Sequence, residues 1–425
     1  GRRVSRDGRV SNRGRSRQLP GHRSGLSVPA PERSPTIPLT TYVSTYVPHH
    51  CGIATFTHDL ASSAGHHQVV ALHPPSGPSV YPSEVRHRIR RDEHADYLRV
   101  ADALNASATD VVSIQHEYGI WGGDDGAHVL DFVRALRRPV VTTLHTVLRH
   151  PTPAQRRILT TLVGMSASTV VMSQAAASML TRAYGVDESR LEIVPHGVPD
   201  LPLVDPSTMK PRLGLEGRMV ILSFGLLGPG KGYESAIAAM PAVVAADPSA
   251  LYVILGATHP DLLLREGEAY RRSLEAKAAA VGMTDHVRFI DRFVGRLELG
   301  TWLEAADIFV TPFPNHDQIV SGTLSYAMSA GRAIVSTPYA YARERLAKGR
   351  GCLVAAGSSD ALATAFVELL ADPARRASYG RRAYEYSRGM VWSTVGAEYG
   401  RILARAALPV LPPLRSVAKL AAVGG

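Results

Sequence analysis

The order of elements is clearest at residues 317–331, which read DQIVSGTLSYAMSAG and lie between two apolar runs. The first run is Ile308-Phe309-Val310, and the second is Ala333-Ile334-Val335. An apolar run, small polar residues, a short helix closed by Gly331 and a second apolar run are the order of a βαβ unit. We therefore expect a helix that begins near Ser321, at the carboxyl end of a parallel strand.

The start of this helix would consist of Ser321, Gly322 and Thr323. A helix start leaves backbone N–H groups without intrahelical acceptors and carries the positive end of the helix dipole, so it attracts phosphate. Ser321 and Thr323 add hydroxyl donors, and Gly322 lets a ligand approach the backbone closely. These residues are equally compatible with the alternative that Ser321 only caps the helix.

The length of 425 residues predicts two domains, because a single core of that size is unusual. Hydrophobic residues make up 45% and charged residues 20%, as in ordinary globular proteins. No run of about 18 apolar residues occurs, so we expect no membrane span. Cys51 and Cys352 lie too far apart in sequence to indicate a disulfide framework or a metal cluster. We expect a cytoplasmic protein without a bound metal.

The formal net charge of +10 is concentrated at the amino end. Residues 1–35 contain nine arginines against Asp7 and Glu32, which gives +7 and leaves +3 for the rest of the chain. The nearly neutral remainder does not favour nucleic acid as a ligand. The composition of this leader predicts disorder and permits peripheral contact with acidic lipids.

A glycine-rich loop in the second half indicates a phosphate cradle. Residues 225–232 read GLLGPGKG and follow the apolar run 219–224. Glycines 225, 228 and 230 supply flexible backbone donors, and Lys231 supplies a point charge just before a predicted helix at 233–246. The loop is not a P-loop, because Gly232 stands where a P-loop has Ser or Thr to hold magnesium.

Several strand ends in the first half carry titratable or flexible residues. The carboxyl ends of parallel strands share one edge of a sheet, so these residues could face a single cleft. A purely structural role is the alternative for Gly52, His116 and His145. The residues concerned are Gly52, His116, Glu117, Tyr118 and His145.

Strands and helices alternate throughout both halves, which predicts an α/β protein of two doubly wound, Rossmann-like domains facing each other across a cleft. The Pro-rich stretch 195–211 is the expected linker. A last helix could cross back onto the first domain. The predicted parts are a leader at 1–35, a first domain at 36–200 with the helix 390–408, a second domain at 201–389 and a tail at 409–425.

Together these stretches resemble the GT-B retaining glycosyltransferases of glycosyltransferase family 4, over residues 38–405. The motifs that carry the resemblance are CGIATF at 51–56, TLHT at 143–146, VPHGV at 194–198, GKG at 230–232 and the run 321–331. Within the family, QHEYG at 115–119 and the 317–327 pattern are similar to a mannosyltransferase-like branch.

The resemblance implies transfer of a hexose, mannose or similar, from a nucleotide-diphosphate sugar to a hydroxyl or saccharide acceptor with retention of configuration. No cofactor or metal would be needed. The implied catalytic residues are His145, which lines the sugar subsite, Lys231, which pairs with the diphosphate, and Glu117 as an acceptor contact. The implied donor-binding residues are Gly52, Gly230, Lys231, Arg292, Gln318, Ser321, Gly322, Thr323 and Tyr326, and the acceptor-side candidates are His116, Glu117 and Tyr118.

The chain departs from the family pattern at two places. Members carry an arginine shortly after the glycine that is Gly225 here, but this chain has Leu226 and Leu227. Members also carry two glutamates eight residues apart, where this chain has Gln318 and Tyr326. These departures raise the alternative of a nucleotide-sugar-binding protein with impaired catalysis. A phosphorylase or epimerase on the same fold is a further alternative.

Overall fold

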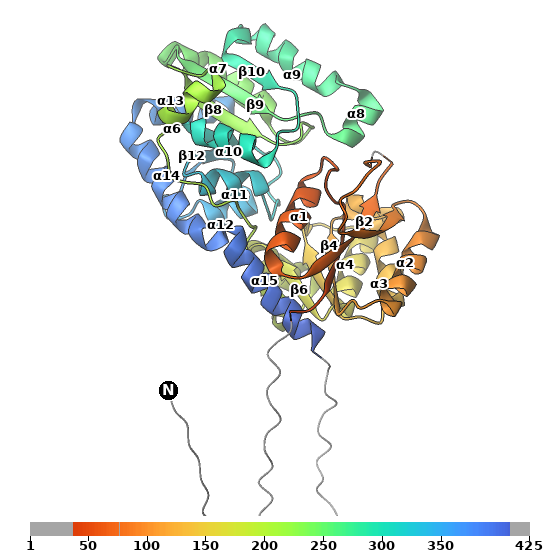
Figure 1. The fold of residues 1–425 in the computed structure, drawn as a ribbon. Coiled ribbons are helices and arrows are strands. Elements are labelled where there is room, and N and C mark those ends of the chain that lie inside the picture. Colours follow the sequence, from red (N-terminus) through yellow and green to blue (C-terminus); the bar gives the residue numbers. More distant parts are fainter. Residues whose placement is uncertain (1–36, 76, 409–425) are drawn as a thin grey trace, which may run out of the picture. The chain divides into compact units, whose positions relative to one another are not determined.

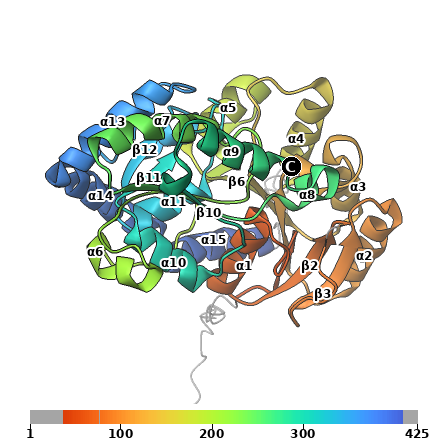
Figure 2. The same ribbon diagram turned by 90° about the horizontal axis from the view of Figure 1, so that it is seen from above.

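Two parallel sheets organise the computed structural model, which describes residues 37–75 and 77–408 (Figures 1 and 2). In this part of the chain, the first sheet has the strand order β3-β2-β1-β4-β5-β6-β7 and the second β10-β9-β8-β11-β12-β13. All strand pairs are parallel. The central order 3-2-1-4-5-6 is that of a Rossmann fold, and it confirms the predicted doubly wound architecture.

The first lobe is built on the first sheet. Its strands are β1 (Thr40–Ser44), β2 (His67–His73), β3 (Val85–Arg90), β4 (Val111–His116), β5 (Val140–Leu144), β6 (Ser168–Val171) and β7 (Leu191–Ile193). Its helices are α1 (Gly52–Ala64), α2 (His94–Ala106), α3 (His128–Ala135), α4 (Pro153–Met165) and α5 (Gln174–Tyr184), with short 3-10 turns η1 (Tyr118–Ile120), η2 (Asp124–Gly126) and η3 (Glu188–Arg190).

The second lobe is built on the second sheet. Its strands are β8 (Met219–Phe224), β9 (Ala250–Leu255), β10 (Val287–Ile290), β11 (Ile308–Thr311), β12 (Ala333–Ser336) and β13 (Cys352–Leu353). Its helices are α6 (Pro206–Met209), α7 (Tyr233–Ala246), α8 (Pro260–Glu266), α9 (Ala269–Ala280), α10 (Arg296–Ala305), α11 (Gly322–Ser329), α12 (Ala340–Arg345), α13 (Ser359–Ala371) and α14 (Pro373–Ser387), with 3-10 turns η4 (Lys210–Leu213), η5 (Thr284–His286) and η6 (Arg388–Met390).

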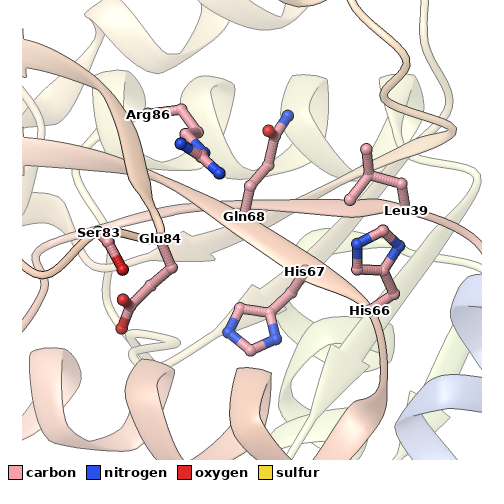
Figure 3. A pocket seen from close by; sticks show the side chains of 7 residues that line it. All are labelled: Leu39, His66, His67, Gln68, Ser83, Glu84 and Arg86. Carbon is pink, nitrogen blue, oxygen red and sulfur yellow. The ribbon is translucent and has the colours of Figure 1, made fainter.

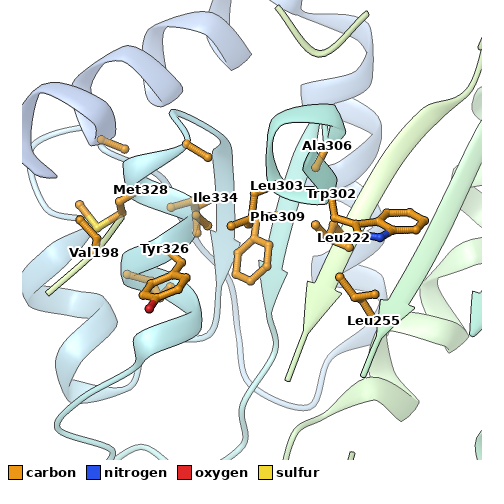
Figure 4. Packing of buried hydrophobic residues seen from close by; sticks show 14 of the residues in the cluster. Val198, Leu222, Leu255, Trp302, Leu303, Ala306, Phe309, Tyr326, Met328 and Ile334 are labelled. Atoms are coloured by element: carbon orange, nitrogen blue, oxygen red, sulfur yellow. The ribbon is translucent and has the colours of Figure 1, made fainter. Parts of the chain in front are cut away.

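Apolar strand residues of the second sheet pack on both of its faces, as expected for a parallel sheet covered by helices on each side. Leu222 of β8 joins a core cluster with Trp302 of α10 and Phe309 of β11, which Figure 4 shows. The next residue back, Ile221, points into the other cluster, under α7 and α13. Successive side chains of a strand alternate between faces, so each strand contributes to both halves of the core.

The last helix, α15 (Trp392–Ala407), packs on the first lobe and confirms the predicted crossing. The Tyr399 hydroxyl forms 2.8 Å hydrogen bonds with Ser113 Oγ of β4 and Thr143 Oγ1 of β5. Where α15 meets α1, Gly396 lies against the carbonyl of Ser63, so close that a Cβ at 396 would come within 2.3 Å of that oxygen. Glycine is therefore required at 396 for this close helix contact.

The apolar pattern does not predict every element, and β3 and α8 are two examples. In the edge strand β3, Arg86, Arg88 and Arg90 alternate with Val85, His87 and Ile89, and the arginine face is exposed. Charged side chains are a common feature of sheet edges. The short helix α8 begins with Pro260, and Leu262 is its one buried residue. Neither segment buries enough apolar surface to leave a strong periodic signal.

The predicted linker near residue 200 falls between β7 and β8, the last strand of one sheet and the first of the other. There, Val198 forms a parallel bridge with Val391, just before α15. The predicted leader and tail lie outside the described residues. Across the part of the chain that is described, no helix is both long and apolar enough to span a membrane.

We predict that Gly396→Ala lowers the free energy of unfolding by about 2 kcal/mol, because the added methyl group overpacks the contact between α15 and α1. The measurement is thermal or urea unfolding of the full chain. The control is Gly164→Ala at the exposed end of α4, where a Cβ would meet no atom within 4 Å. That change should be neutral or stabilise by up to about 1 kcal/mol. Equal effects of the two variants would contradict the close contact.

Candidate functional site

The start of α11 has free donor groups. Ser321 caps the helix, since its Oγ accepts a hydrogen bond from Leu324 N at 3.3 Å and lies 3.1 Å from Thr323 Oγ1. By helix geometry, the N–H groups of Gly322 and Thr323 have no intrahelical acceptor. Neither donates to another residue in the described part of the chain. Ser321 therefore caps the helix while the amides of Gly322 and Thr323 stay free, and a bound anion could accept hydrogen bonds from these amides.

Lys231 lies opposite this helix start, in the loop between β8 and α7. Its Nζ is 5.0 Å from the centroid of the Phe313 ring, and among the described residues it has no acidic partner. The flanking Gly230 and Gly232 have φ of 82° and 74°, the left-handed region that favours glycine. Burial without a counter-ion lowers the pKa of Lys231. An anion that enters this site would supply the missing charge.

One pocket contains both features. It has a volume of about 120 Å³, and it lies outside the carboxyl ends of β8 and β11, where the strand order reverses. Open α/β sheets bind ligands at this position. A drug-sized pocket measures roughly 300–1,000 Å³, so this one accommodates a phosphate-sized part of a larger ligand. The lining residues are Phe224, Gly225, Lys231, Tyr233, Phe313, Gln318, Val320, Ser321, Gly322 and Thr323.

The aromatic residues of this pocket are absent from the sequence prediction. Phe224, Tyr233 and Phe313 are apolar residues at the ends of β8 and β11 and at the start of α7, so the sequence pattern assigns them to the core. Their positions could have indicated a place in the site. Phe224 is the last residue of β8 and Phe313 follows β11 by two residues, so both lie at the carboxyl edge of the sheet, where ligands bind.

Other predicted donor residues lie elsewhere or are already engaged. Gln318 lines the pocket, but its Nε2 donates to Val320 O at 2.9 Å. The Tyr326 ring is buried, and its hydroxyl donates to Asp59 Oδ2 at 3.4 Å. Arg292 is exposed and forms a two-point ion pair with Glu298, outside the pocket.

Two predicted glycines are open to ligands. Gly52 is the first residue of α1, and Gly230 lies in the loop before Lys231. Both are exposed, and a Cβ at either position would meet no atom within 4 Å. Neither glycine is among the residues that line the pocket.

The first-lobe residues His145 and His116 are buried at adjacent strand ends. His145 Nε2 donates to Gln115 Oε1 at 2.9 Å, and burial lowers the pKa of His145 to about 3. Burial also lowers the pKa of His116 to about 4, and neither of its ring nitrogens has a partner in the described residues. Both imidazoles are therefore neutral at pH 7 and cannot serve as proton donors of ordinary strength.

Glu117 has both carboxyl oxygens occupied. Oε1 accepts from Tyr118 N at 3.0 Å, and Oε2 accepts from the Thr146 hydroxyl. Burial raises the pKa of Glu117. The hydroxyl of Tyr118 donates to Gln155 O at 3.5 Å. These contacts hold together the loops after β4 and β5, which suits a structural role for Glu117.

A second hollow of about 320 Å³ lies at the amino ends of β1, β2 and β3 (Figure 3). It is lined by Leu39, His66, His67, Gln68, Ser83, Glu84 and Arg86. Ligands of open α/β sheets bind at the opposite, carboxyl edge. The larger hollow is therefore not the candidate site. Within the described residues, no group of three or more His, Cys, Asp or Glu could hold a metal ion.

Two family models match the chain. The model described as Glycosyltransferase Family 4 matches residues 51–200, and the model described as Glycosyl transferases group 1 matches residues 218–372. The first falls on the first lobe and the second on the lobe that contains the pocket.

Curated relatives match at low identity. A phosphatidyl-myo-inositol mannosyltransferase of Mycolicibacterium smegmatis is 28% identical over 280 residues, which cover 64% of this chain and 66% of the relative. A D-inositol 3-phosphate glycosyltransferase of Xylanimonas cellulosilytica is 28% identical over 290 residues, which cover 63% of this chain and 66% of the relative. The matched part thus spans slightly less than two thirds of these relatives.

Solved structures share the fold. HepE of Anabaena, in complex with UDP and glucose, superimposes with a TM-score of 0.70 at 16% identity, covering 86% of this chain and 100% of that one. Sucrose-phosphate synthase of Thermosynechococcus elongatus has a TM-score of 0.69 at 17% identity and covers 86% and 98%. With a family model on each lobe and this shared architecture, the chain belongs to glycosyltransferase family 4 and has the GT-B fold.

Proposed function

We propose that this protein transfers a sugar from a nucleotide-diphosphate sugar to a hydroxyl acceptor, with the diphosphate bound at the start of α11. The observation that supports this most is the single pocket that contains an unpaired lysine and two free helix amides. An ammonium group and a helix N-terminus are both favourable for phosphate oxygens. The pocket accommodates a phosphate-sized part of this ligand, and the base and the sugar would extend beyond it.

The transfer would depend on stabilising the departing diphosphate. As the glycosidic bond breaks, negative charge grows on the phosphate oxygens while the sugar becomes oxocarbenium-like. Lys231, the amides of Gly322 and Thr323, and the hydroxyl of Thr323 would neutralise this charge without a metal ion. Preorganised donors of this kind typically contribute about 3 kcal/mol each to transition-state stabilisation.

We propose retention of configuration, with the acceptor approaching the face from which the diphosphate leaves. His145 would contact the sugar as a neutral imidazole. Its Nε2–H is used by Gln115, so Nδ1 carries the lone pair and could accept a hydrogen bond from a sugar hydroxyl. The low pKa of His145 keeps this lone pair available at pH 7.

The names of the relatives support a hexose donor and a polyol acceptor. One is named as a mannosyltransferase of phosphatidyl-myo-inositol and another as a glycosyltransferase of D-inositol 3-phosphate. We therefore propose mannose or a similar hexose as the transferred sugar and a saccharide or inositol hydroxyl as the acceptor. Product analysis with a labelled donor separates this activity from phosphorolysis and epimerisation.

A second candidate function is binding of a sugar nucleotide without transfer. It is favoured by the engagement of the Gln318 amide with Val320 and of the Tyr326 hydroxyl with Asp59. These are the positions of the two family glutamates, and neither side chain is a carboxylate. Such a protein would bind nucleoside diphosphates and release none from a sugar donor during long incubation.

Lys231→Ala should lower kcat at least about a hundredfold, because it removes the only cationic side chain among the pocket's lining residues. The measurement is the release of nucleoside diphosphate from the sugar donor in the presence of acceptor. Lys277→Ala on α9, a lysine outside the pocket, is the matched control and should retain wild-type turnover. Unchanged turnover of Lys231→Ala would contradict the assigned role.

Binding of nucleoside diphosphate should weaken as pH rises through the lowered pKa of Lys231. The ammonium form binds the phosphate, and burial makes it lose its proton at a lower pH than an exposed lysine would. Calorimetric titration with UDP and GDP between neutral and alkaline pH measures the effect. Lys231→Arg should abolish the alkaline weakening, because a guanidinium stays charged. The same alkaline loss in that variant would show that another group is responsible.

Leu226→Arg should tighten binding of nucleoside diphosphate about tenfold, since one charge-assisted hydrogen bond contributes roughly 1.5–3 kcal/mol. Leu226 is half-buried, whereas Leu227 is buried in the core, so of the two positions only 226 leaves a charged side chain access to solvent. Leu226→Gln is the uncharged control. If both variants bind nucleoside diphosphate as the wild type does, the absence of the family's arginine does not limit nucleotide affinity at this site.

A further inference from the structure

His196 belongs to the VPHGV motif, and the proposed mechanism gives it no part. The segment is fixed on both sides by backbone hydrogen bonds. Val194 N donates to Val171 O at 3.0 Å, which continues the first sheet. Val198 N donates to Met390 O at 2.9 Å, and Trp392 N donates to Val198 O at 3.0 Å. The backbone that carries His196 is therefore held between β6 and the beginning of α15.

The His196 ring has one defined tautomer. Nδ1 lies 2.7 Å from Gly197 O, and a carbonyl oxygen only accepts, so Nδ1 carries the proton. Nε2 is then the nitrogen with the lone pair. The ring is 9% exposed and lies 5.0 Å from the Phe56 ring, and burial lowers the pKa of His196 to about 4. His196 is thus a rigid, neutral group at pH 7.

This ring packs directly against the start of α11. A Cβ at Gly322 would come within 2.9 Å of His196 Nε2 and 3.2 Å of Cε1. Gly322 lines the phosphate pocket, whereas His196 does not. The ring therefore lies behind the helix start. A lone pair beside the positive end of a helix is electrostatically favourable, and a protonated imidazole would not be.

The segment before α11 is attached to the same lobe. Ser173 Oγ donates to Ile319 O at 2.8 Å, and Arg149 Nε pairs with Asp317 Oδ1 at 2.7 Å. These contacts restrain residues 317–319 but do not reach the amides of 322 and 323. Among the described residues, the three atoms nearest to a Cβ added at Gly322, the first residue of the helix, all belong to the His196 ring.

We propose that His196 is a positioning residue of the donor site, which fixes the start of α11 and so places the Gly322 and Thr323 amides for the diphosphate. This inference rests on the proposed function of that pocket. The packing of the His196 ring also explains why residue 322 is a glycine, because a Cβ there would come too close to the ring. Displacements of about 1 Å in such groups can cost a hundredfold in rate.

The test is a double-mutant cycle on the full chain with His196→Ala, Gly322→Ala and the double variant. UDP and GDP are titrated calorimetrically, and donor KM and kcat are measured. We expect Gly322→Ala to weaken binding at least about tenfold, because its methyl group pushes the helix off the ring. The double variant should bind at least about fivefold tighter than Gly322→Ala alone, because the ring that clashes is gone. His196→Ala should raise donor KM more than it lowers kcat.

Controls separate a fold defect from a positioning effect. Thermal unfolding checks each variant, Gly164→Ala serves as a neutral glycine control, and His196→Ser replaces His196→Ala if that variant does not fold. If the double variant binds no better than Gly322→Ala, or if His196→Ala binds and turns over as the wild type does, the inference is overturned. If the wild type binds neither nucleotide, the proposed function itself fails, and the inference fails with it.

Discussion

The candidate site depends on one electrostatic arrangement, in which the ammonium group of Lys231, without an acidic partner among the described residues, faces the positive end of a helix. Both Lys231 and the start of α11 are unfavourable to bury without an anion, and both lie where the strand order of the second sheet reverses. The sheet topology brings the two together from segments about 90 residues apart. The rest of the second lobe holds this arrangement in place through a core on each face of its sheet.

The first lobe supplies neutral, rigid groups. The imidazoles of His116, His145 and His196 are all buried with lowered pKa values, so they add no positive charge to the first lobe at pH 7. Contacts from Ser173, Arg149 and His196 reach the segment that leads into α11. Ser173, Arg149 and His196 therefore tie the anion-binding helix and the segment before it to the first lobe.

The fold could be predicted from the sequence wherever burial was strong and periodic. The prediction of a helix at 233–246 agrees with α7, and the crossing helix α15 was expected from its position after the second domain. The exposed β3 and the short α8 bury too little apolar surface to be predicted. In the site, glycine and charge patterns indicated Lys231 and Ser321 to Thr323. The aromatic lining and the bond from Tyr326 to Asp59 depend on tertiary packing that no local pattern encodes.

The most direct measurement is a crystal structure of the chain with bound UDP or GDP. The account predicts diphosphate oxygens within about 3 Å of Lys231 Nζ and of the backbone nitrogens of Gly322 and Thr323. A nucleotide bound with its phosphates elsewhere, with Lys231 and the start of α11 still unoccupied, would contradict it.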